Sequence, residues 1–224
     1  MPLARWKDLC LDATDARVAA QFWSRALGGR RIEHQGNGDA ALRGDAPDQT
    51  VWISRVPEPK TVKNRVHLDL VLPSVAPLLD AGASVTREVD EGEVRWAVLA
   101  DPEGNEFCAF APGDGEPSAL VVDATAAEDI AAWWAEVLGA TLRDGPDGRL
   151  RWLAEVPGLP FDVMKFVPVP EPKVVKNRWH WDVDCDDVAA LVARGARVLR
   201  EPDDEVRWHV LADPAGNEFC AFSS

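Results

Sequence analysis

The pattern of hydrophobic and polar positions predicts a strand, a helix and further strands, in that order, at four places along the chain. The first strand is expected at residues 9–12, and the apolar residues that follow recur at helical spacing until Gly28-Gly29 ends the helix. These helical positions are Val18, Phe22, Ala26 and Leu27. The stretch 120–139 repeats the same pattern, again with a glycine at its end.

Alternate residues of the stretch 65–72 are apolar, which predicts a strand with one apolar face. A short helix is expected over residues 75–81, and two strands joined by a turn at residues 101–105 complete the unit. Proline, glycine and asparagine in that turn suit a chain reversal. Hairpins of this kind indicate an α+β fold rather than a parallel sheet with crossover helices.

The chain is a tandem repeat. Residues 56–67 and 169–180 agree at ten of twelve positions, and residues 93–110 and 205–222 agree at sixteen of eighteen. A repeat of this length is the size of a whole domain. The segment 112–118 is rich in glycine, proline and acid and reads as a linker. We therefore expect two homologous domains, 1–112 and 118–224.

Composition narrows the range of partners. The 224 residues carry a formal net charge of −14, which disfavours nucleic acid and anionic membranes. No apolar run is long enough to span a bilayer, and the first residues have no hydrophobic signal core. Four cysteines without zinc-type spacing fit a reducing compartment. We expect a cytoplasmic protein.

Histidines on the polar face of the fifth strand and of its repeat are the candidate catalytic residues. His67 stands between Arg65 and Asp69, and His180 stands between Arg178 and Asp182. A histidine with such neighbours can carry a proton or act as an oriented ligand. The alternative is that arginine and aspartate form an ion pair and the histidine is a structural polar group.

Cysteines occupy matching places in the last strand of each domain, at Cys108 and Cys220. As candidate ligand-binding residues they join Arg65, Asp69, Arg178 and Asp182. A buried thiol that acts as a small hydrophobe is the competing interpretation. The basic residues before each histidine can hold an anion or simply balance neighbouring acids.

The strand–helix–three-strand cycle, together with the motifs KNRxHxD and DPxGNEFC, resembles the vicinal oxygen chelate superfamily. Its members include glyoxalase I, bleomycin-resistance proteins and extradiol dioxygenases. The resemblance covers nearly the whole chain twice. It implies an α+β fold of paired βαβββ modules, the glyoxalase/bleomycin-resistance/dioxygenase fold. Four modules are implied, two in each tandem homologous domain, with each pair forming a cup round a ligand.

In metal-dependent members of the superfamily, ligands come from the first, fourth, fifth and last strands of a paired unit. Carried over to this sequence, the resemblance offers Asp8, His67 and Cys108 as a metal set in the first domain. The second domain offers only His180 and Cys220. The fourth strands, near residues 51–54 and 163–166, supply no histidine or carboxylate. We therefore expect no cofactor, and a divalent metal is the alternative.

Three functions remain open. The favoured one is a glyoxalase-like protein that binds a small organic molecule in a cup without the usual metal site. Tryptophans in or near strands suit planar or cationic ligands, at Trp6, Trp52, Trp96, Trp152 and Trp208. The alternatives are a metal-dependent enzyme of the glyoxalase type, a lyase or dioxygenase, and a metal-independent enzyme with a histidine general base. Because the duplication brings two domains into one chain, we expect intrachain domain pairing in a monomer or a weak homodimer.

Overall fold

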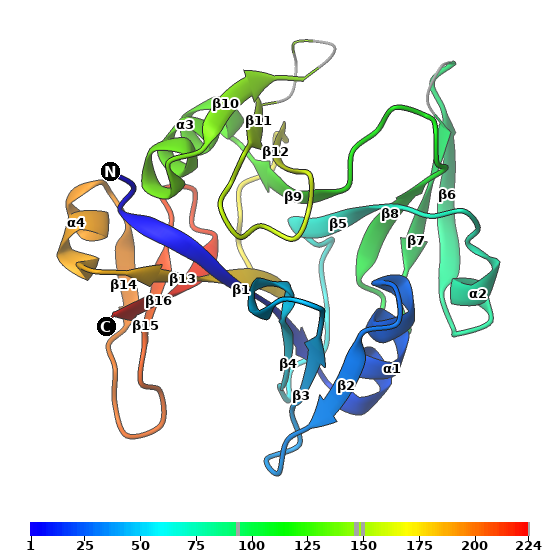
Figure 1. Cartoon of the computed structure of the whole chain (residues 1–224), viewed down its shortest axis with the longest axis horizontal. Coiled ribbons are helices and arrows are strands. Elements are labelled where there is room, and N and C mark those ends of the chain that lie inside the picture. The colour runs from blue at the N-terminus through cyan, green and yellow to red at the C-terminus, as the bar shows by residue number, and fades with distance from the viewer. Residues whose placement is uncertain (93–94, 146–147, 149–150, 224) are drawn as a thin grey trace.

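The computed structural model describes residues 1–92, 95–145, 148 and 151–223. Its strands and helices form four modules of one strand, one helix and three strands (Figure 1). The first module consists of β1 (Ala4–Ala13), α1 (Ala16–Ala26), β2 (Arg31–His34), β3 (Ala40–Arg43), the 3₁₀ helix η1 (Pro47–Gln49) and β4 (Val51–Arg55). The second consists of β5 (Val66–Val71), α2 (Ala76–Leu79), β6 (Ser84–Asp90), β7 (Arg95–Ala100) and β8 (Glu106–Phe110).

The second half repeats this order. The third module consists of β9 (Ala119–Ala124), α3 (Ala127–Leu138), β10 (Thr141–Asp144), β11 (Arg151–Ala154) and β12 (Val163–Pro168). The fourth consists of β13 (Trp179–Cys185), α4 (Val188–Ala193), β14 (Arg197–Arg200), β15 (His209–Ala212) and β16 (Glu218–Ser223). The fold class predicted from the sequence, tandem βαβββ modules, is confirmed.

The modules pair between the two repeats, not within them. One eight-stranded sheet has the order β14-β15-β16-β13-β1-β4-β3-β2 and so joins the first module to the fourth. The other has the order β10-β11-β12-β9-β5-β8-β7-β6 and joins the second module to the third. The expectation that each domain forms its own cup is therefore wrong.

The connections are long enough for this pairing. The linker 112–118 joins β8 to β9, which lies beside β5 in the same sheet. The arm 56–65 runs between β4 and β5, which belong to different sheets, and its counterpart runs between β12 and β13. Ten extended residues can span roughly 33 Å, enough to cross from one sheet to the other. Figure 1 shows the two arms crossing between the sheets.

The longer helices cover the apolar faces of the sheets. The Asp15 side chain caps the start of α1 by accepting from the backbone N–H groups of Arg17 and Val18. The Trp23 ring meets Trp179 at 4.8 Å, edge to face, and an equivalent contact joins α3 to β13 through Trp134 and Trp181. Because Trp179 and Trp181 are fully buried there, the alternate residues of β13 face the opposite side of the sheet.

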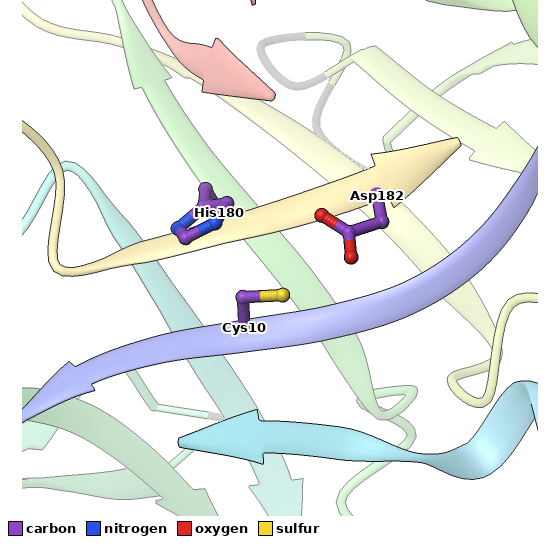
Figure 2. A group of neighbouring side chains, drawn as sticks. All are labelled: Cys10, His180 and Asp182. Carbon is purple, nitrogen blue, oxygen red and sulfur yellow. The ribbon is translucent and has the colours of Figure 1, made fainter. Parts of the chain in front are cut away.

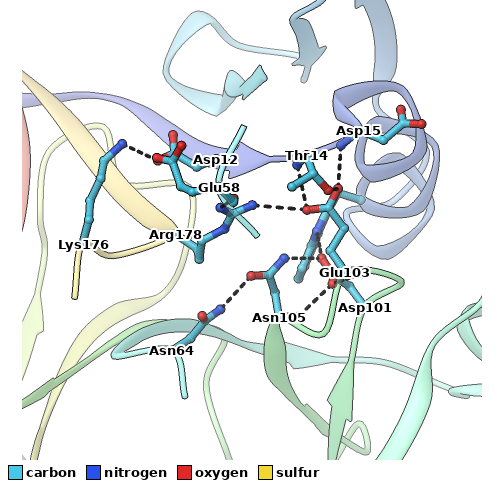
Figure 3. A network of polar contacts seen from close by, with 11 residues as sticks. Asp12, Thr14, Asp15, Glu58, Asn64, Asp101, Glu103, Asn105, Lys176 and Arg178 are labelled. Atoms are coloured by element: carbon cyan, nitrogen blue, oxygen red, sulfur yellow. Dashed lines mark hydrogen bonds and ion pairs between the residues drawn. The ribbon is translucent and has the colours of Figure 1, made fainter. Parts of the chain in front are cut away.

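A polar network, partly exposed at Thr14 and Asp15, holds the first and second modules together (Figure 3). The Glu103 carboxylate accepts hydrogen bonds from Thr14 and from the Asp15 backbone N–H, and it pairs with Arg178 at 3.2 Å. Asp101 accepts from the Trp23 indole. The network thus fixes the turn between β7 and β8 against α1 and against the start of β13.

Among the described residues, no helix combines the length and the apolar character needed to cross a membrane.

Candidate functional site

One face of the β5–β9 sheet lines a cavity of about 470 Å³. We call this face the lysine cup and define it by His67, Asp69, Cys108 and Lys165, all of which line the cavity. The strands place these residues at one level, because His67 and Val121 are cross-strand partners, as are Val121 and Lys165. Cys108 lies opposite Asp69 on the neighbouring strand.

Lys165 is the central charge of the lysine cup. Its side chain is only 3 % exposed, and its ammonium lies 3.1 Å from Asp69 Oδ2 and 2.9 Å from Glu116 Oε2. His67 Nε2 lies 3.6 Å from the other oxygen of the same aspartate. The buried carboxylate of Asp69 therefore already has a cation, as buried charges require.

Aromatic rings form the wall beside this ion pair. The Lys165 ammonium lies 5.1 Å from the centre of the Trp152 ring and 5.6 Å from that of Phe110. Trp96 stacks on Phe110 with 5.7 Å between ring centres, and both rings line the cavity. The predicted role of tryptophan in a cup thus has two candidates here, whereas Trp6 belongs to the hydrophobic core.

The corresponding face of the other sheet carries Cys10, His180, Asp182 and Cys220, and we call it the cysteine cup. Figure 2 shows the first three converging from β1 and β13, and their ligand atoms lie within 4.8 Å of one another. Cys220 lies opposite Asp182 on β16. Burial raises the pKa of Asp182 to about 7 and raises the pKa of both thiols. Burial also lowers the pKa of His180.

The two cups occupy equivalent places in the two sheets but differ at single positions. Where the lysine cup has Val121, the cysteine cup has Cys10, since each lies opposite the histidine of its cup. Trp52 of the cysteine cup takes the place of Lys165 in the lysine cup. Lys165 is the parallel partner of Val121 on β9, and Trp52 is the parallel partner of Cys10 on β1.

The metal set drawn from the resemblance is not brought together. His67 and Cys108 meet in the lysine cup, but Asp8 lies on β1 in the other sheet, opposite Asp182. That set assumed that the first and fifth strands of one domain share a cup. Because the modules pair between repeats, they do not.

The two arginines predicted beside the histidines lie outside the cups. Arg65 and Arg178 line an adjoining cavity of about 490 Å³ between the two crossing arms, which shares Lys63 and Asp123 with the lining of the lysine cup. Arg65 donates to the backbone carbonyl of Glu171, and Arg178 donates to that of Glu58. Their guanidinium groups therefore tie each arm to the other, so the prediction that they share the cup with the histidines is wrong.

The residues of each cup can be tested against the metal that the superfamily implies. In the lysine cup, His67, Asp69 and Cys108 lie close together. The Lys165 ammonium occupies the space beside the carboxylate, so a second cation there would meet strong repulsion. This cup does not fit a metal. The cysteine cup offers two thiols, an imidazole and a carboxylate with no lysine or arginine within 4 Å of Asp182 among the described residues, and its donors fit a soft metal.

Sequence reasoning missed three of these residues. Lys165 interrupts an otherwise apolar strand, Glu116 belongs to the linker, and Cys10 falls in the apolar run of β1. A lone lysine inside a hydrophobic strand is a usable signal, because burial of a lysine requires a partner. Cys10 carried no comparable signal, since its repeat counterpart is Val121.

With this architecture established, comparison with known proteins places the chain. Paired βαβββ modules with one cup in each sheet define the glyoxalase-like class of the vicinal oxygen chelate fold. The sequence profile of the Glyoxalase-like domain matches residues 8–110 and again residues 119–222, so the chain belongs to that family. No curated protein matches the sequence.

Solved structures share the fold over nearly the whole chain. Glyoxalase I from Zea mays is 15 % identical with a TM-score of 0.68, covering 98 % of this chain and 92 % of its own. A putative dioxygenase from Bacillus subtilis is 10 % identical with a TM-score of 0.64, and the coverage is 98 % and 85 %. The cppA protein from Streptococcus pneumoniae is 10 % identical with a TM-score of 0.53, covering 99 % of this chain and all of its own. At these identities the likeness concerns the fold alone.

Proposed function

We propose that the chain binds a small, planar organic molecule in the lysine cup, without a metal ion. The observation that carries this proposal is Lys165, which neutralises Asp69 at the point where a metal-dependent relative needs ligands. The cup keeps a cavity of about 470 Å³ after this ion pair has formed. Cavities of this size hold small organic ligands.

The walls of the cavity favour a flat ligand. Trp96 and Trp152 contribute large aromatic surfaces, and Val121 and Val167 add apolar area between them. Rings of a bound ligand can stack on indole faces, and such contacts contribute about 0.5–1.5 kcal/mol each beyond the burial of surface.

Charge favours a neutral or cationic ligand over an anion. Five acidic residues line the cavity, against three basic ones. Most of these charges are already paired: Lys63 with Asp123, Lys165 with Asp69 and Glu116, and Glu106 with Lys60. Among the described residues, Glu91 and Arg87 are the charged lining residues with no partner within 4 Å, so the lining itself is close to neutral. The net charge of −14 further attracts cations to the protein.

Fluorescence tests the proposal directly. Metal-stripped protein is titrated with proflavine, a planar cation, and with fluorescein as a planar anion, and the anisotropy of each dye is followed. We expect saturable binding of proflavine at a single site, weakened in Trp152→Leu and unchanged in Trp208→Leu. Failure of the planar cation to bind, or equal binding by both variants, would falsify the proposal.

A second candidate function rests on His67, which lines the same cavity beside Asp69. A neutral imidazole there can accept a proton from a bound molecule, so the cup can serve a metal-independent acid–base enzyme. Once a ligand is known, His67→Ala separates the two functions. An enzyme loses turnover in this variant while it still binds the ligand, whereas a binding protein shows no turnover in either form.

A further inference from the structure

Lys165 is a buried amine on the wall of a cavity. Among the described residues it is the one lysine that is buried, and it lines the lysine cup together with Trp152 and Phe110. Lysine is almost never fully buried unless it is paired, and its two acids explain why it is tolerated there. A buried lysine that borders a cavity is also the kind of amine that forms Schiff bases with carbonyl compounds.

The ammonium of Lys165 has an N–H group to spare. An ammonium has three N–H donors, and the described residues accept from two of them, Asp69 at 3.1 Å and Glu116 at 2.9 Å. The centres of the Trp152 and Phe110 rings lie 5.1 Å and 5.6 Å from the nitrogen. Because these rings and the lysine border one cavity, a flat carbonyl compound can approach the amine while it stacks on the indole.

Asp69 has an open position for the proton that the ammonium must lose. Its Oδ2 atom accepts from the ammonium, while its Oδ1 atom is buried and has no hydrogen-bond partner among the described residues. His67 Nε2 lies 3.6 Å from Oδ1, which is too far for a hydrogen bond. Buried polar atoms nearly always have a partner, so this oxygen is available to bind a proton.

We propose that Lys165 forms a Schiff base with a planar aldehyde bound in the lysine cup. The ammonium gives one proton to Asp69, and the nitrogen lone pair then forms a bond to the carbonyl carbon. A second proton passes from the nitrogen to the new alkoxide. Asp69 returns the first proton to this hydroxyl, which leaves as water while the nitrogen lone pair closes the C=N bond. One ammonium and one aldehyde thus give one protonated imine and one water, with no oxidation or reduction.

The protonated imine preserves the charge balance of the cup. Its nitrogen carries the same positive charge as the ammonium, so Asp69 and Glu116 keep their counter-ion. Buried acids that lose their cation are strongly destabilising. An acylated lysine is neutral and would leave both acids unpaired. The two carboxylates therefore favour an aldehyde over an acylating ligand.

This inference rests on the proposed function, because the aldehyde must occupy the cavity proposed for a planar ligand. It adds the class of the ligand and a covalent step at a named nitrogen. The cysteine cup has Trp52 in the place of Lys165, so the chemistry belongs to one cup.

Reductive trapping tests the Schiff base in the full chain. The protein is incubated with 2-naphthaldehyde, a planar neutral aldehyde, and with sodium cyanoborohydride, which reduces a C=N bond to a stable secondary amine. Peptide mapping by mass spectrometry then locates the naphthylmethyl groups. We expect at least roughly tenfold more label on Lys165 than on Lys176, because a bound aldehyde is held beside its amine. Lys176 is 51 % exposed and lies outside the lysine cup.

A matched competitor and a matched variant serve as controls. An excess of 2-naphthalenemethanol, which has the same rings but no carbonyl group, should suppress the label on Lys165 and spare that on Lys176. Lys165→Arg keeps the positive charge but forms no Schiff base, so residue 165 should carry no label while Lys176 still does. If this variant does not fold by circular dichroism, the wild-type maps with and without the competitor decide the question.

The Schiff base is refuted if Lys165 is labelled no more than Lys176, or if the competitor does not protect it. Proflavine binding distinguishes this failure from failure of the proposed function. Saturable proflavine binding without labelling of Lys165 refutes the Schiff base and leaves the ligand site in place. Absence of proflavine binding refutes the planar-cation site in its own assay, whatever the peptide map shows.

Discussion

The lysine cup and the cysteine cup are built from the same repeated strands, yet the buried aspartate of each cup has different neighbours. Each has a histidine, an aspartate two residues later and a cysteine on the neighbouring strand. In one cup a lysine from β12 neutralises the aspartate, and in the other a tryptophan stands in its place. A single position therefore decides whether the aspartate of a cup has a lysine beside it.

The largest effect is expected from separating the repeats, because both cups depend equally on pairing between them. Residues 1–112 alone contain β1 and β5 but lack their partners β13 and β9. We expect this fragment to be unfolded or to form a dimer in which two copies supply the missing strands. Light scattering after size-exclusion chromatography, together with circular dichroism, distinguishes these states. A folded monomeric fragment would contradict the pairing described above.

Lys165→Met should cause the next largest effect. Removing this cation leaves Asp69 and Glu116 without their partner, which costs about 3–5 kcal/mol of unfolding free energy for a buried pair. Urea denaturation measures the loss. Arg95→Met is the control, because Arg95 and its partner Asp90 are 74 % and 59 % exposed and their pair should contribute less than about 1 kcal/mol.

A double variant sharpens this result. Adding Asp69→Asn to Lys165→Met removes the unpaired charge and should restore part of the lost stability. Equal stability of wild type and Lys165→Met would show that Lys165 does not neutralise the cup.

Glu103→Ala tests a second difference between the halves. Glu103 binds Thr14, Asp15 and Arg178, whereas its repeat counterpart is Ala215 (Figure 3). We expect a loss of about 2–3 kcal/mol, because the variant leaves Arg178 buried without its acid. Thermal or urea unfolding gives the value. The exposed Glu88→Ala should change stability by less than about 0.5 kcal/mol, and an equally small change for Glu103→Ala would refute the role of the network.

The smallest effect concerns ligand affinity. Trp152 lines the lysine cup and lies opposite Lys165. Its equivalent in the cysteine cup is Ala41, which lies opposite Trp52. Trp152→Leu should weaken proflavine binding by about 0.5–1.5 kcal/mol, roughly twofold to twelvefold, and should leave the far-UV circular dichroism spectrum unchanged. Dye anisotropy and circular dichroism measured on one preparation give both values. A parallel loss of both would mean that the variant damages the fold rather than the ligand site.

Much of the fold could be predicted because the alternation in residues 65–72 and the helical spacing after residue 12 each record a buried face. The same alternation placed His67 and Asp69 on one face, and the structure brings them together with Cys108. The pairing of modules could not be predicted in this way. The apolar faces of the repeats are so alike that pairing within a domain and pairing between domains bury equivalent residues.

The candidate sites were only partly predictable for the same reason. The sequence groups Asp8 with His67 because no pattern in it specifies which sheet β1 joins. Arg65 alternates correctly with His67, but it lies at the end of the crossing arm, where a carbonyl of the other arm accepts its hydrogen bond. The place of Lys165 and Cys10 in a cup depends on which strands lie beside them. No local sequence pattern specifies those neighbouring strands.

Crystallography of the proflavine complex tests the role of the lysine cup most directly. A crystal of the full chain is soaked with proflavine in the absence of metal ions. The account predicts planar density beside Trp152 and Trp96, with Lys165 still paired with Asp69. Dye bound elsewhere on the chain, with no density in the lysine cup, would contradict it.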